Sequence, residues 1–201
     1  MESTDIGSQL KFPDYMTEKF TEYDPLRLTA FEDGKEIKLM TYRYKVLENI
    51  ATKGIIFFLH GLGEYCEHDA FIFKLFAENG FESFAMDQRG IGNSGGLKGY
   101  QGTGATIHND IDLFIYHTIH KYNIDTQQTP LFLFGMSFGA VLSFNVTLKN
   151  PNLFKGQALV VPFFDLKDNR INKFFWIWKA FEFFSPTLPI KKKRYYEPEY
   201  Y

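Results

Sequence analysis

From Gly54 onward, short apolar runs alternate with amphipathic helical patterns, and this alternation limits the possible fold more than any other feature of the sequence. The first run, GIIFFL, carries no polar residue, which predicts a strand buried on both faces. Three further strands are predicted, at 81–86, 131–134 and 156–164, and three helices between them, at 68–79, 110–122 and 138–149. This order is typical of a mostly parallel sheet with helices on both faces, so the predicted fold class is α/β.

Two β-rich segments precede this region and flank an Asp-Gly pair at positions 33 and 34. Asp-Gly is a strong hairpin signal, so 27–30 and 37–46 are predicted to pair as an antiparallel hairpin. The predicted organisation is a leader over 1–22, one α/β core over 23–165, and a segment of different, aromatic character over 166–201.

Composition excludes some classes of protein and indicates a compartment. The net charge is −2, which does not favour nucleic acid as a partner. Cys66 is the single cysteine, so no intrachain disulfide forms, which favours a reducing compartment. The N-terminal residues lack the pattern of a signal peptide, and no run approaches about 20 apolar residues. We therefore expect an intracellular protein, either cytoplasmic or peripheral to a membrane.

The motif most directly tied to chemistry is Gly-Met-Ser-Phe-Gly, between a predicted strand and a predicted helix. Gly135 and Gly139 lack side chains, so strand and helix can pass closely, and the sharp turn strains Ser137 and exposes its hydroxyl. Ser137 is therefore the candidate nucleophile, and the Phe138 N–H at the helix start can face a developing oxyanion. The alternative is a glycine-rich turn with a bystander serine.

A second motif, HGLGEY, follows the strand GIIFFL directly. Gly61 and Gly63 allow this loop to approach a substrate, and the Leu62 N–H is the candidate for a second oxyanion donor. His60 is interpreted as a histidine that shapes the loop rather than as a base.

A third motif, DQRGIGNSGG (87–96), follows the predicted strand 81–86 and is interpreted as a glycine-rich turn, since no Lys-Ser/Thr pair makes it a phosphate loop. In this order, the three motifs resemble those of the α/β-hydrolase superfamily, and above all monoacylglycerol lipases and lysophospholipases of the serine aminopeptidase S33 type. The resemblance implies ester hydrolysis through an acyl-enzyme, with an acylglycerol or lysophospholipid substrate and neither cofactor nor metal. It also implies Ser137 as nucleophile and the Leu62 and Phe138 amides as the oxyanion hole. Four residues depart from the family pattern without removing a catalytic group: Met136, Ala140, Gln88 and Ile91.

The general base is missing from the expected place. In this superfamily the triad runs serine, acid, histidine along the chain, yet all five histidines precede Ser137. Losing the triad histidine lowers kcat by about 10⁶, so these residues alone are not expected to be a competent hydrolase. Two explanations stay open. The sequence is part of a longer enzyme, interrupted after the sixth strand and the start of a lid, or it is an inactive structural subunit whose open sheet edge binds a protein partner.

The segment FFWIWKAFEFF (174–184) is apolar at nearly every position and is followed by three lysines and an arginine. In the lipase-like relatives this region begins a lid. Phe174, Trp176 and Trp178 suit a membrane interface, which predicts peripheral membrane contact. The alternative is a lid helix or a partner-binding helix that packs on protein.

Overall fold

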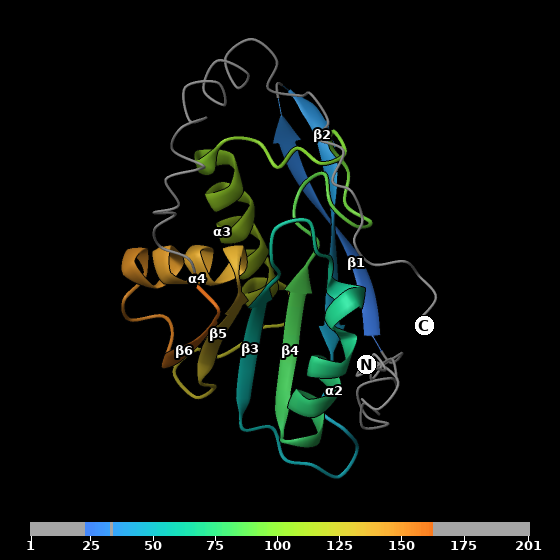
Figure 1. Ribbon diagram of the computed structural model, residues 1–201. Helices are drawn as coiled ribbons and strands as arrows, with labels where there is room; N and C mark the ends of the chain where they lie inside the picture. The colour runs from blue at the N-terminus through green and yellow to red at the C-terminus, as the bar shows by residue number, and fades with distance from the viewer. Residues whose placement is uncertain (1–22, 33, 163–201) are drawn as a thin grey trace, which may run out of the picture. The chain divides into compact units, whose positions relative to one another are not determined.

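The computed structural model describes residues 23–32 and 34–162 (Figure 1). The predictions for the leader 1–22, for the lid segment 166–201 and for Phe174, Trp176 and Trp178 lie outside the described residues. No helix in the described part of the chain is long and apolar enough to cross a membrane.

The described residues form a six-stranded sheet in the order β1-β2-β4-β3-β5-β6. The antiparallel hairpin consists of β1 (Tyr23–Glu32) and β2 (Lys35–Tyr44), and β2 also pairs with β4 in the antiparallel sense. The other pairs are parallel, as predicted, and join β3 (Gly54–Leu59), β4 (Phe81–Met86), β5 (Leu131–Met136) and β6 (Gly156–Val160). Both the hairpin and the parallel α/β sheet are therefore confirmed.

Helices cover both faces of this sheet. One core cluster joins β3 and β5 to α3 (Gly104–Lys121) and α4 (Phe138–Lys149), and a second cluster on the other face includes Phe58 of β3 and Phe73 of α2 (Ala70–Glu78). All six residues of β3 are buried, which confirms a strand covered on both faces. Because β3 lies between the parallel strands β4 and β5, the loops that follow these three strands meet at its carboxyl end.

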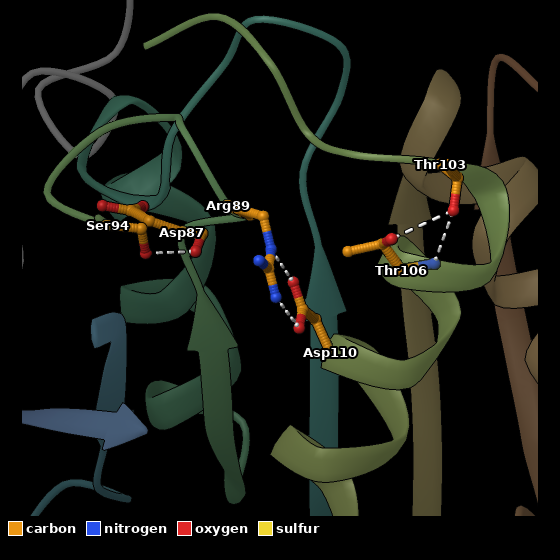
Figure 2. A network of polar contacts seen from close by, with 6 residues as sticks. All are labelled: Asp87, Arg89, Ser94, Thr103, Thr106 and Asp110. Carbon is orange, nitrogen blue, oxygen red and sulfur yellow. Dashed lines mark hydrogen bonds and ion pairs between the residues drawn. The ribbon is translucent and has the colours of Figure 1, made fainter. Parts of the chain in front are cut away.

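Several element boundaries differ from prediction. The hairpin strands are longer or shifted, since β1 spans 23–32 rather than 27–30 and β2 spans 35–44 rather than 37–46, and β5 extends two residues further, to Met136. The segment predicted as one helix over 68–79 begins as a 3₁₀ turn, η2 (Cys66–Asp69), before α2. Helix α3 begins six residues before the predicted start, because the Thr103 side chain accepts a hydrogen bond from the Thr106 N–H and caps the first turn (Figure 2). Strand β6 ends at Val160 because Val161 adopts a left-handed φ of 49°, so the strand is shorter than predicted.

Candidate active site

Ser137 occupies a strained turn between β5 and α4. Its φ is 50° and its ψ is −112°, in a region that residues with a side chain rarely adopt. A Cβ built on Gly139 would lie 2.0 Å from the Leu59 carbonyl oxygen, and one on Gly135 would lie 2.4 Å from the Gly139 oxygen. Strand and helix can therefore pass this closely only with glycine at both positions, as the sequence pattern predicts. The backbone strain of the turn therefore falls on Ser137, the predicted nucleophile.

A backbone bond from the neighbouring strand holds the turn in place. The Ser137 N–H donates to the Val160 carbonyl oxygen at 2.8 Å, and Val160 is the last residue of β6. The end of β6 therefore fixes the position of the serine. Sequence reasoning missed this contact, because no residue type encodes a bond between two backbone groups.

The loop after β3 lies directly beside Ser137. A Cβ built on Gly61 would be 3.5 Å from the Ser137 Cβ, so the two residues are neighbours in space. Glu64 closes the loop on itself: its N–H donates to the Gly61 carbonyl at 3.2 Å, and its Oε2 accepts from the Gly61 N–H at 3.2 Å. Gly63 supplies a φ of 74°, and the Leu62 side chain at the tip is 58% exposed. The structure thus brings the two predicted glycine-rich motifs together at the carboxyl edge of the sheet.

His60 is fully buried at the base of this loop, and both of its ring nitrogens have partners. Nε2 accepts the Gln88 N–H at 2.9 Å, so the ring proton resides on Nδ1, which donates to the Gly61 carbonyl at 2.8 Å. Burial lowers the pKa of His60, which favours the neutral ring that this pattern requires. In this arrangement His60 joins the loops after β3 and β4 and has no nitrogen available to take a proton from Ser137.

The other four histidines also make no hydrogen bond with Ser137 in the described part of the chain. His117 and His120 lie in the last turns of α3, which leads back to the start of β5 and hence to the opposite edge of the sheet. His68 is exposed on η2, where its Nδ1 lies 3.8 Å from Asp69 Oδ1. Within the described residues, none of these histidines is therefore hydrogen-bonded to Ser137.

The glycine-rich turn after β4 is a brace built on Asp87. The Asp87 carboxylate accepts hydrogen bonds from the Cys66 N–H at 2.8 Å, the Tyr42 hydroxyl at 3.0 Å and the Asn93 N–H at 2.8 Å. The Ser94 hydroxyl donates to the Asp87 carbonyl at 2.5 Å, as Figure 2 shows. Burial raises the pKa of the Tyr42 hydroxyl, so Tyr42 stays a donor. These bonds join β2, η2 and the turn into one unit.

A buried ion pair anchors the same turn to α3. Arg89 Nε and Nη2 each donate to the Asp110 carboxylate at 2.8 Å, and Figure 2 shows the fork facing the carboxylate. Both side chains are buried. The sequence contained a signal that could have revealed the pair: an aspartate on the apolar side of a predicted helix needs a partner. The sequence interpretation did not use it.

Taken together, the parallel sheet, the strained serine and the loop beside it define an α/β-hydrolase. The chain belongs to the serine aminopeptidase S33 family, whose family model matches residues 50–198.

Curated relatives and solved structures agree with this assignment. A monoglyceride lipase of Rattus norvegicus is 27% identical over 113 residues, which are 55% of this chain and 35% of the lipase. An uncharacterized abhydrolase domain-containing protein of Dictyostelium discoideum is 35% identical over 119 residues, which are 58% of this chain and 11% of that protein. The crystal structure of a soluble variant of monoglyceride lipase from Saccharomyces cerevisiae, in complex with a substrate analog, has a TM-score of 0.66 and 24% identity. The matched region covers 83% of this chain and 55% of the chain in the yeast structure. The chain thus spans about a third of the rat lipase and about half of the yeast lipase structure.

Proposed function

We propose that this chain carries the nucleophile and the oxyanion hole of a serine hydrolase that cleaves carboxylic esters of the monoacylglycerol or lysophospholipid type. The observation that carries the proposal is Ser137 at its strained turn, with Gly61 as its neighbour. In the proposed reaction the Ser137 Oγ attacks the acyl carbonyl carbon and the alcohol leaves with a proton. Water then hydrolyses the resulting ester. The Leu62 and Phe138 N–H groups stabilise the oxyanion in both steps.

The substrate class rests on relatives. The curated matches include proteins named monoglyceride lipase from rat and yeast, and the yeast structure holds a substrate analog. The proposed chemistry needs no metal or organic cofactor, because an oxyanion hole and a proton-accepting side chain suffice for ester cleavage.

The proposed base is a histidine outside these 201 residues, together with the acid that orients it. No histidine follows Ser137 in the sequence, and both nitrogens of His60 are occupied. On their own, these residues are expected to retain at most the ~10³–10⁴-fold acceleration that an oxyanion hole supplies without its triad.

A second candidate function is that of a structural subunit without turnover. It is supported by the unavailability of His60 and by β6, whose one neighbouring strand among the described residues is β5. The free backbone groups along such an edge can pair with a strand of a partner protein. In either case we propose that 166–201 begins a lid, and that Phe174, Trp176 and Trp178 contact a membrane surface.

Labelling with a fluorophosphonate probe distinguishes the two functions. The protein is isolated from its native source, its intact mass is compared with 23.5 kDa, and the labelled residue is located by peptide mass spectrometry. The proposed hydrolase is expected to be labelled at Ser137, and the S137A variant is expected to stay unlabelled. The control S143A, which changes a buried serine inside α4, should keep the label. A folded native protein that stays unlabelled at Ser137 would overturn the hydrolase and favour the structural subunit.

A further inference from the structure

The peptide group between Gly61 and Leu62 is held in one orientation through its carbonyl. The Gly61 carbonyl oxygen accepts two hydrogen bonds, one from His60 Nδ1–H at 2.8 Å and one from the Glu64 N–H at 3.2 Å. A trans peptide group is planar, so its C=O and its N–H point in opposite directions. The two donors on the carbonyl therefore fix the direction of the Leu62 N–H, which faces away from both of them.

The Leu62 N–H itself has no hydrogen-bond acceptor among the described residues. It directly follows Gly61, where a built Cβ would lie 3.5 Å from the Ser137 Cβ. An oriented donor without an acceptor, beside the serine, is the arrangement that stabilises a developing oxyanion, because no reorganisation is needed when the charge forms.

The His60 ring is held in turn by Gln88, from the glycine-rich turn after β4. The Gln88 N–H donates to His60 Nε2 at 2.9 Å, and Gln88 Nε2 donates to the His60 carbonyl oxygen at 2.9 Å. Gln101 supports Gln88, since its Nε2 donates to Gln88 Oε1. All three residues are buried, so water does not compete for these bonds. Because Nε2 is used as an acceptor, the proton of the neutral ring stays on Nδ1, where it reaches the Gly61 carbonyl.

We infer that His60 is a positioning residue that aims the Leu62 N–H, and that Gln88 holds the His60 ring in the tautomer and place that this requires. The inference rests on the proposed function, which gives the Leu62 N–H its role in the oxyanion hole. Gln88, which departs from the family pattern, suits this position because an amide side chain donates and accepts at once. Neither residue needs to touch the substrate or the reacting atoms.

Two substitutions of His60 separate this role from a merely structural one. The amide of asparagine lies near the place of Nδ1, so H60N can still donate to the Gly61 carbonyl but loses the bond to the Gln88 N–H. The amide of glutamine lies near the place of Nε2, so H60Q can still accept the Gln88 N–H but loses the donor on the Gly61 carbonyl. If His60 only joined the two loops, H60Q would be the milder change. If it aims the peptide, H60N is the milder change.

Nuclear magnetic resonance of the 201-residue chain reports the orientation without requiring turnover. Glycine is labelled with ¹³C at the carbonyl and leucine with ¹⁵N, so that only Gly-Leu pairs give a correlation signal. The sequence holds two such pairs, Gly61–Leu62 and Gly96–Leu97, and the second is an internal control. H60Q should move the Gly61–Leu62 signal and leave the other in place, whereas H60N should keep the Gly61–Leu62 signal near its wild-type position. An unmoved Gly61–Leu62 signal in H60Q would overturn the inference.

The wild type provides a measurement that needs no variant, in case a substitution of this buried residue prevents folding. The ¹⁵N shifts of the His60 ring, the one fully buried histidine of the five, should show a proton on Nδ1 and none on Nε2. A proton on Nε2 would overturn the inference, because the ring could then not accept the Gln88 N–H.

Hydrolysis of a p-nitrophenyl ester by the full-length protein tests the consequence for catalysis. Removing one oxyanion-hole donor lowers kcat by about 10²–10³-fold, so H60Q should approach this loss with an unchanged KM, and H60N should recover most of the activity. The control H117Q, which changes an exposed histidine of α3, should match the wild type. Equal values of kcat for H60Q and H60N would overturn the inference. If the full-length wild type neither hydrolyses esters nor is labelled at Ser137, the proposed function fails, and the resonance measurements still decide whether His60 orients the peptide.

Discussion

Substituting Asp69 by asparagine should remove a pH-dependent loss of stability. The pKa of this carboxyl is raised from 3.8 to about 6, mainly because burial disfavours the charged form. Between those values the folded state keeps a proton that the unfolded state has released, so the free energy of unfolding falls as pH rises. The full stability is present below the unfolded pKa, and the loss is complete once the pH exceeds about 6. A difference of about 2 pKa units corresponds to about 3 kcal/mol.

The assay is urea unfolding followed by far-UV circular dichroism at pH 4, 5, 6, 7 and 8. Other groups titrate equally in both proteins, so the informative quantity is the stability of D69N minus that of the wild type. This difference should rise by about 2 kcal/mol between pH 4 and pH 7 and then level off, because part of the total is already lost at pH 4, just above the unfolded pKa of 3.8. The control E67Q should follow the wild type at every pH. A difference between D69N and the wild type that does not change with pH would refute the assignment of a buried, raised-pKa carboxyl at this position.

Further predictions concern the contacts that hold the site. D110N leaves the Arg89 charge buried without its partner and should lower the free energy of unfolding by about 3–5 kcal/mol. As a control, K149M breaks the exposed ion pair between Lys149 and Asp112 and should leave the urea midpoint unchanged. Equal midpoints for the two variants would contradict the burial of the first pair. G139A places a Cβ 2.0 Å from a backbone oxygen and should prevent the turn from forming, which thermal unfolding will report. A Cβ built on Gly104, in the first turn of α3, meets nothing within 4 Å, so G104A should stabilise the chain by up to about 1 kcal/mol. A melting temperature for G139A as high as that of G104A would exclude the close packing of Gly139 against the Leu59 carbonyl.

Much of the fold could be predicted from the sequence because its signals are local. Unbroken apolar runs such as GIIFFL identify strands buried on both faces, and Asp-Gly identifies the hairpin. The serine turn was predictable for the same reason, since Gly135 and Gly139 are required by a close approach that occurs at that place in the chain. Where the signal was weaker, the boundary was wrong: the start of α3 depends on the Thr103 cap, which the apolar pattern does not reveal.

The sequence by itself therefore determined the layered α/β architecture, the position of Ser137 and the glycine-rich loop after β3 that lies beside it. Tertiary structure alone decided how those parts are held: the bond from Ser137 to Val160, the pairing of Arg89 with Asp110, and the burial of Asp69. The physical reason is that a hydrogen bond or an ion pair depends on where two distant segments meet. A pattern of residue types along the chain reports only local propensity and polarity. The energy of an ion pair depends on the distance between its two charges, and that distance is fixed only when the sheet has assembled.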